Sequence, residues 1–184
     1  MRLPEELRRA IEREVAAVDA RLLPRAAREI SQRYQKGEAL ALRSPAHLAA
    51  YLATRLPATF AANHRVFEEV AARMPGLAPR SLLDLGAGPG IAAWAAAETW
   101  PSIEHVTLVE AETAMAAAGR ALAAHGDAAL RDACWLEQDA LTAGTETAEL
   151  VVASYLLGEL EARQLDAAVE HAWTLAADTL VIVE

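Results

Sequence analysis

A glycine-rich turn follows a short apolar segment near the middle of the chain. It reads DLGAGPG over residues 84–90, and Pro89 is placed to begin a helix directly after it. Glycines in such a turn let the backbone pass close to a ligand. A turn that seats a dinucleotide has its third glycine one residue later, and the carboxylate of Asp84 repels phosphate. The turn therefore favours a ligand with a cationic end, such as the methionine ammonium of S-adenosylmethionine.

Acidic and amide side chains end the next two apolar segments. Glu110 stands twenty residues after Gly90, where a carboxylate can accept hydrogen bonds from both ribose hydroxyls of a nucleoside. Gln138 and Asp139 end the third segment, where a side chain can meet an adenine amino group. We therefore predict an S-adenosylmethionine site formed by Asp84, Gly86, Ala87, Gly88, Glu110, Gln138 and Asp139.

Five short apolar segments are separated by stretches long enough for crossover connections. We expect strands at 81–85, 105–110, 133–138, 149–154 and 179–184. The alanine-rich stretches 89–98, 111–124 and 159–177 have helical patterns, whereas 139–148 is too short and too rich in Gly and Thr for a helix. This alternation predicts a Rossmann-like, doubly wound α/β fold with a parallel sheet.

The chain before this region has the apolar spacing of helices. A stripe from Leu7 to Leu22 predicts a first helix of about five turns, and Pro24 begins a second that Gly37 would end. Ser44-Pro45 would cap a third, and a fourth carries Phe60, Phe67, Val70 and Met74 on its buried side. We expect two parts: a helical N-terminal region over 1–76 and a cofactor-binding core over 77–184.

The charge of the chain is unevenly distributed between these parts. The formal net charge is −9, but residues 1–80 carry 14 basic and 9 acidic side chains, whereas residues 81–184 carry 3 and 17. A basic helical region beside an acidic one predicts that the helices contact RNA. A solvated arginine-rich surface without a nucleic-acid partner is an equally good interpretation.

Composition also bears on the location of the protein. A single cysteine, Cys134, excludes an internal disulfide and suits a reducing compartment. No apolar run reaches the roughly 18–20 residues of a membrane span, and the acidic opening segment does not fit a signal peptide. We expect a cytoplasmic protein without a membrane partner.

Longer segments resemble class I S-adenosylmethionine-dependent methyltransferases, and more narrowly the ribosomal small-subunit methyltransferase-like family, bacterial relatives of a mitochondrial small-subunit assembly factor. The resemblance covers about residues 40–184. It is carried by AHLAAYLATRLPATFAANHRVFEEV, APRSLLDLGAGPGIAAWAA, LVEAETAMAAAGRAL and ASYLLGEL. It implies a methyltransferase that acts on small-subunit ribosomal RNA or assists assembly of the small subunit.

The sequence departs from the family pattern at its C-terminal end. The fold normally adds a β-hairpin after strand five, and the family usually has cysteines in its C-terminal half that bind an iron–sulfur cluster or metal. This sequence stops at Glu184, inside the fifth strand, so we expect a truncated core whose strand-five edge promotes self-association. Cys134 is expected to be a small core residue, and no metal ligand is assigned.

The segment after the fourth strand offers candidates for a catalytic role. Nucleic-acid amine methyltransferases commonly have an Asn/Asp-Pro-Pro-Tyr/Phe turn here, whereas this chain has Ser154-Tyr155-Leu156-Leu157. Tyr155 could stack on a flipped base and Ser154 could form a hydrogen bond to it. Without the usual motif, two alternatives stay open: a non-catalytic, cofactor-binding assembly factor and a small-molecule methyltransferase.

Overall fold

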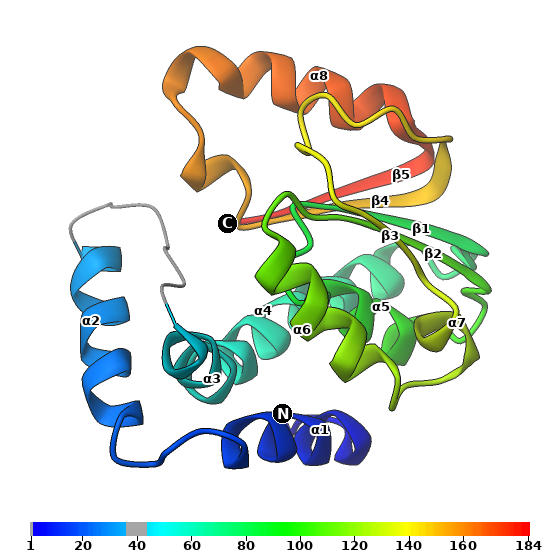
Figure 1. Cartoon of the computed structure of the whole chain (residues 1–184). Coiled ribbons are helices and arrows are strands. Elements are labelled where there is room, and N and C mark those ends of the chain that lie inside the picture. Colours follow the sequence, from blue (N-terminus) through cyan, green and yellow to red (C-terminus); the bar gives the residue numbers. More distant parts are fainter. Residues whose placement is uncertain (1, 36–43) are drawn as a thin grey trace.

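The computed structural model describes residues 2–35 and 44–184, and for Tyr34 and Gln35 it describes the backbone alone. In this part of the chain five parallel strands form one sheet in the order β3-β2-β1-β4-β5 (Figure 1). The strands are β1 (Ser81–Leu85), β2 (His105–Val109), β3 (Cys134–Leu136), β4 (Ala148–Ser154) and β5 (Ala176–Val183). The predicted α/β class is confirmed.

The central strand is the first in sequence, and this brings the glycine-rich turn to the middle of the sheet. β1 pairs with β2 on one side and with β4 on the other, and Asp84 lies opposite Leu108 and Val152. Because all strands are parallel, the segments that follow β1, β2 and β4 leave the sheet on the same side, at the carboxyl ends of the strands. Ligands in open α/β sheets bind at these carboxyl ends.

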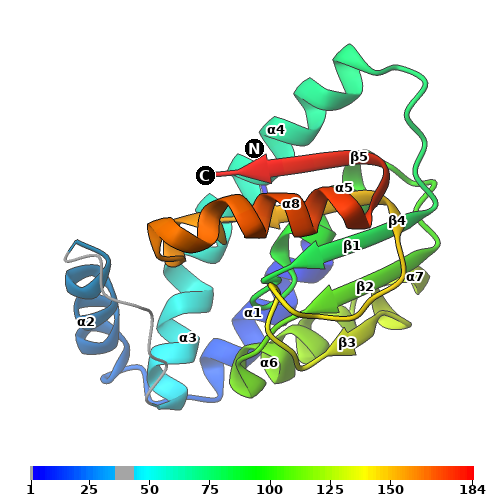
Figure 2. The same ribbon diagram turned by 90° about the horizontal axis from the view of Figure 1, so that it is seen from above.

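Helices cover the two faces of the sheet unequally (Figures 1 and 2). One face carries α5 (Ile91–Thr99), α6 (Thr113–Ala123) and the short α7 (Ala128–Arg131). The other carries α8 (Leu165–Leu175), and the 139–148 crossover packs Ala140 and Ala143 into the same apolar cluster without forming a helix, as expected.

Four helices form the N-terminal region: α1 (Glu5–Ala16), α2 (Leu23–Gln35), α3 (Pro45–Thr54) and α4 (Leu56–Arg73). The predicted cap of α3 is confirmed, since the Ser44 side chain accepts a hydrogen bond from the backbone N–H of His47. The longest of them, α4, packs along α5, and Phe67 and Trp100 meet there with ring centroids 5.4 Å apart. The largest apolar cluster joins α1, α3 and α4 to the sheet, whereas α2 packs on α3 in a separate cluster.

The first helix is shorter than predicted. It ends at Ala16, and Leu22 is 51% exposed rather than part of a buried stripe. The reason lies at Asp19, whose side chain accepts a hydrogen bond from the backbone N–H of Arg21 at 3.0 Å and so favours a turn over another helical turn. The predicted helix end at Gly37 lies outside the described residues.

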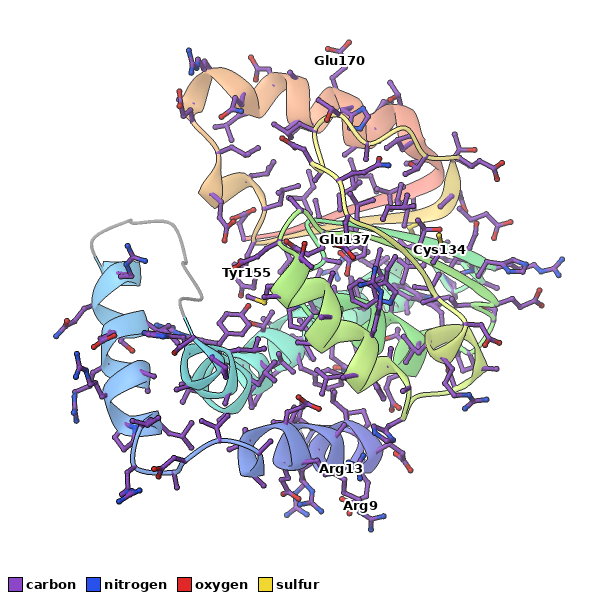
Figure 3. The ribbon with its side chains drawn as sticks, in the orientation of Figure 1. Arg9, Arg13, Cys134, Glu137, Tyr155 and Glu170 are labelled. Atoms are coloured by element: carbon purple, nitrogen blue, oxygen red, sulfur yellow. The ribbon has the colours of Figure 1, made fainter. Side chains whose placement is uncertain are left out.

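Three further expectations are corrected. Met74 is 41% exposed because α4 ends one residue before it. Helix α8 begins at Leu165 rather than near 159, because two short 3-10 turns, Leu157–Glu159 and Ala162–Gln164, precede it. Cys134 is exposed rather than a core residue because it begins the edge strand β3 (Figure 3).

The length and hydropathy of the helices bear on membrane insertion. Among the described residues, none is both long enough and apolar enough to cross a bilayer.

Candidate functional site

The turn after β1 has the backbone geometry of a ligand-binding loop. Gly86, Gly88 and Gly90 all have positive φ, at 68°, 54° and 77°. A β-carbon at Gly86 would lie 2.8 Å from the Leu156 side chain, so this glycine allows the segment after β4 to approach the turn. A β-carbon at Gly88 would meet no atom within 4 Å, so the loop faces open space there.

Asp84 is a buried carboxyl group below this loop. It has no exposed surface, and neither of its oxygens has a hydrogen-bond partner among the described residues. Burial, and then the negative charge of Glu110, raises the pKa of Asp84 from 3.8 to about 8, an effect that the nearby backbone N–H of Ala93 partly offsets. A buried carboxyl group without partners is costly in a folded protein, so it points to a ligand that supplies the missing contact.

Glu110 connects the ends of β1 and β2. One carboxylate oxygen accepts a hydrogen bond from the backbone N–H of Gly88 at 2.7 Å, and the other accepts one from the backbone N–H of Glu112, also at 2.7 Å. These contacts fix the carboxylate beside the glycine turn. The strand-end spacing of Asp84 and Glu110 thus brings both acids to one place.

The segment after β4 forms a third wall. Tyr155 has a positive φ of 56°, which is strained for a residue with a β-carbon, and its backbone N–H donates to the carbonyl of Val183 on β5 at 2.7 Å. Its side chain is 42% exposed. Next to it, the Ser154 hydroxyl accepts a hydrogen bond at 2.9 Å from the amide of Asn63, a fully buried residue of α4.

These elements enclose a cavity of about 610 Å³ at the carboxyl ends of the strands. Of the nine residues with predicted roles, eight line it: Asp84, Gly86, Ala87, Gly88, Glu110, Asp139, Ser154 and Tyr155. Gln138 is exposed and lies outside this lining. Asp139 is on the rim, where its side chain accepts a hydrogen bond from the backbone N–H of Leu141 at 2.8 Å.

The cavity contains more acids than sequence reasoning had placed there. Glu112, Glu159 and Glu184 also line it, and they give six carboxyl groups with Asp84, Glu110 and Asp139. Partial burial and the neighbouring acids raise the pKa values of Glu112 and Glu159. The lining is thus suited to a cationic ligand and unfavourable to phosphate.

Residues of the N-terminal helices complete the wall. Tyr51, Arg55, Ala58 and Thr59 of the α3–α4 region line the cavity. The sequence predicts these helices as a region separate from the cofactor-binding core, although the four-residue spacing of Arg55, Thr59 and Asn63 marks one helical face.

Comparison with known proteins identifies the family. The protein-family model described as "Mitochondrial small ribosomal subunit Rsm22" matches residues 45–184. The human "Ribosome assembly protein METTL17, mitochondrial" is 41% identical over 66 residues, which are 35% of this chain and 14% of the human protein. The aligned part is therefore a small fraction of that relative.

Solved structures identify the fold. The mitomycin 7-O-methyltransferase MmcR superposes with a TM-score of 0.62 at 17% identity, over 86% of this chain and 49% of its own. Magnesium protoporphyrin IX methyltransferase from Synechocystis PCC 6803, determined with bound S-adenosylmethionine, gives a TM-score of 0.54 at 16% identity, over 82% of this chain and 67% of its own. These similarities establish a methyltransferase fold and nothing finer. The family model matches about three quarters of the length of this chain, and the solved structures share its fold. The chain therefore belongs to the Rsm22 family and has the class I methyltransferase fold.

Proposed function

We propose that this protein binds S-adenosylmethionine in the cavity at the strand ends and methylates small-subunit ribosomal RNA during assembly of the subunit. The observation that carries the cofactor proposal is Asp84, a fully buried carboxyl group without a hydrogen-bond partner among the described residues, in a cavity lined by six acids. The family and the human relative, a ribosome assembly protein, support the subunit as partner.

The residues present fit this cofactor. Asp84 and the acid-rich lining suit the cationic methionine end, and the open space beside Gly88 leaves room for it. Glu110, held by the backbone of Gly88 and Glu112, has lone pairs left for the two ribose hydroxyls. Asp139, on the rim, remains our candidate for the adenine amino group.

When bound, S-adenosylmethionine would supply an electrophilic methyl group on its sulfonium. The acceptor side of the cavity contains Ser154 and Tyr155. Since the Ser154 oxygen accepts its hydrogen bond from Asn63, its own proton remains available for an acceptor atom of the substrate. Tyr155, held in a strained conformation and partly exposed, is our candidate for stacking on a flipped base.

Calorimetry tests the cofactor site. Asp84→Ala and Glu110→Ala are each expected to weaken S-adenosylmethionine binding by about 1.5–3 kcal/mol, the range for hydrogen bonds to charged groups. Glu170→Ala is the matched control, since this exposed glutamate on α8 points away from the sheet (Figure 3). Unchanged affinity in both cavity variants would overturn the assignment.

A second function, a cofactor-binding assembly factor without catalysis, is favoured by two observations. The segment after β4 lacks the Asn/Asp-Pro-Pro-Tyr/Phe turn, and the six acids of the cavity oppose the approach of an RNA backbone. Transfer of a labelled methyl group to small-subunit particles separates the two functions. Label in the RNA supports catalysis, whereas cofactor binding without label supports the assembly role. Label in a small molecule, with no RNA binding at moderate salt, would instead favour a small-molecule methyltransferase.

A further inference from the structure

One face of α4 is fixed against the carboxyl end of β4. The side-chain amide of Asn63 donates to the carbonyl of Thr59, one turn earlier, and to the hydroxyl of Ser154, at 2.9 Å in both cases. Arg55 precedes Thr59 by another four residues, so all three lie on the same face of the helix. Arg55 and Thr59 both line the cavity.

The order of the strands places this face at a defined end of the proposed ligand. Glu110 follows β2 and Ser154 ends β4, with β1 and Asp84 between them. If the ribose lies at Glu110 and the ammonium at Asp84, the amino-acid end of the ligand extends toward β4. That is the side on which α4 presents Arg55 and Thr59.

The charges of the lining single out Arg55. S-adenosylmethionine carries a sulfonium, an ammonium and a carboxylate, and the six acids of the cavity can favour only the first two. Among the described residues of the lining, Arg55 is the one basic side chain, and it is half-buried. A guanidinium group matches the two oxygens of a carboxylate in a bidentate hydrogen bond.

We infer that Arg55 binds the carboxylate of the methionine moiety. This inference rests on the proposed cofactor site and assigns to the N-terminal helices a direct role in it. The backbone of Arg55 also joins α3 to α4: its N–H donates to the carbonyl of Tyr51 at 2.9 Å, and its carbonyl accepts from the N–H of Thr59 at 3.0 Å. These main-chain bonds remain when the side chain is replaced, so Arg55→Ala should fold.

The test compares two ligands that differ only in this carboxylate. Affinities of S-adenosylmethionine and decarboxylated S-adenosylmethionine are measured by calorimetry on the full chain and on Arg55→Ala, with folding checked by circular dichroism. Arg55→Ala is expected to lose about 10- to 100-fold in affinity for S-adenosylmethionine and little for the decarboxylated ligand. Arg55→Lys should fall between, because a lysine retains the charge without the fork geometry.

Arg65→Ala is the matched control, since Arg65 is on α4, the helix that Arg55 precedes, lies outside the cavity lining and forms an ion pair with Glu69. It should alter neither affinity. If Arg55→Ala weakens both ligands by the same factor, or neither, Arg55 does not bind the carboxylate. If the unaltered chain binds neither ligand, the cofactor proposal itself is overturned. The two failures are therefore distinguishable.

Discussion

At Asp84, ligand binding and folding stability make opposite demands. Its burial without a partner raises its pKa to about 8, so in the absence of ligand the folded protein keeps this group protonated near neutrality. A cationic ligand would favour the ionised form instead. Asp84 thus destabilises the protein without ligand and stabilises the complex, a combination typical of binding sites.

The cost of Asp84 can be measured through the pH dependence of unfolding. The folded state holds the proton of the Asp84 carboxyl group more tightly than the unfolded chain does. The contribution of Asp84 to the free energy of unfolding is therefore most favourable below the unfolded-state pKa of 3.8, and it is lost as the pH rises toward 8. The loss amounts to at most about 1.4 kcal/mol for each pH unit. Asp84→Asn, which resembles the protonated form, should lack this dependence, so its advantage over the unaltered protein grows from pH 5 to pH 8. Urea unfolding without ligand measures both proteins, and parallel curves would contradict the raised pKa.

The same protonation should appear in ligand binding. If S-adenosylmethionine binds the ionised form of Asp84, its affinity rises by up to about tenfold for each pH unit below 8, because the ionised fraction rises by that factor. Asp84→Asn should bind more weakly and lose this part of the pH dependence. Calorimetry from pH 6 to pH 8.5 tests this, and an unaltered slope in the variant would assign the dependence to another group.

Helix α6 packs closely against β3 at Gly119, where the indole ring of Trp135 lies against the helix backbone. A β-carbon at Gly119 would lie 2.1 Å from the indole ring of Trp135, so the helix can only pack here without a side chain. The Arg120 guanidinium lies 5.7 Å from the centre of the same ring, and it forms an ion pair with Glu137 at 2.9 Å. The indole is therefore enclosed on more than one side.

Gly119→Ala should lower the free energy of unfolding despite the better helix propensity of alanine. Propensity favours the variant by about 1 kcal/mol, whereas overpacking against a rigid ring costs typically 1–3 kcal/mol. Gly144→Ala, where a β-carbon would meet no atom within 4 Å, is the control and should be nearly neutral. Replacing Trp135 by Leu should remove most of the penalty, and a penalty that persists in the double variant would refute the steric explanation.

The outer strand β5 supports another prediction at this scale. It pairs with β4 on one side, and among the described residues no strand pairs with its other side. Its apolar Ile182 is 37% exposed. We expect concentration-dependent self-association of this chain in sedimentation experiments, weakened by Ile182→Lys because charge blunts a sheet edge. Val169→Lys on α8 is the control for added charge, and a monomer at high concentration would contradict the prediction.

The elements also show what the sequence could predict. The five strands and the glycine turn were predictable because parallel strands are continuous apolar segments and the turn needs glycine at fixed places. The end of α1 was not, because a local contact of Asp19 overrides the apolar stripe. Helix α7 was missed although Asp127 caps it, accepting a hydrogen bond from the N–H of Leu130 at 3.0 Å.

The site itself was predictable where strand ends determine it. Asp84, Glu110 and Ser154 come together because each lies at the carboxyl end of a neighbouring strand or within one residue of it. Glu184 directly follows β5, so its place was predictable in the same way. Glu159 joins them through the short 3-10 turn Leu157–Glu159, which local patterns did not predict. The contribution of Arg55 depends on how α4 packs against β4, a contact between residues 91 positions apart. Such long-range packing cannot be read from local patterns.

For the whole molecule, the uneven charge has a more specific structural basis than the sequence suggests. Several arginines of α1, of α2 and of the turn between them form ion pairs with nearby acids: Arg8 with Glu5, Arg21 with Asp19 and Arg25 with Glu29, at 2.7, 2.7 and 2.8 Å. These exposed pairs add little stability, but they offset much of the local positive charge.

Arg13 and Arg28 differ from these arginines. Both are exposed, and within the described part of the chain neither forms an ion pair. In Figure 3, Arg9 and Arg13 lie on the side of α1 that points away from the sheet. This surface is thus separated from the acidic cavity at the strand ends.

If these helices contact RNA, the arginines without ion pairs should contribute most. The double variant Arg13→Gln/Arg28→Gln is expected to bind small-subunit RNA more weakly, with little dependence on its sequence, because phosphate contacts position without specifying. The slope of log affinity against log salt should fall by about 0.7–0.9 for each lost contact.

Arg8→Gln/Arg25→Gln removes the same formal charge from paired arginines and should have a smaller effect, while the affinity for S-adenosylmethionine should change in neither variant. A filter-binding salt titration compares them. Equal slopes in all three proteins would mean that the positive charge of the N-terminal helices serves solubility and internal pairing, and that RNA contacts the protein elsewhere.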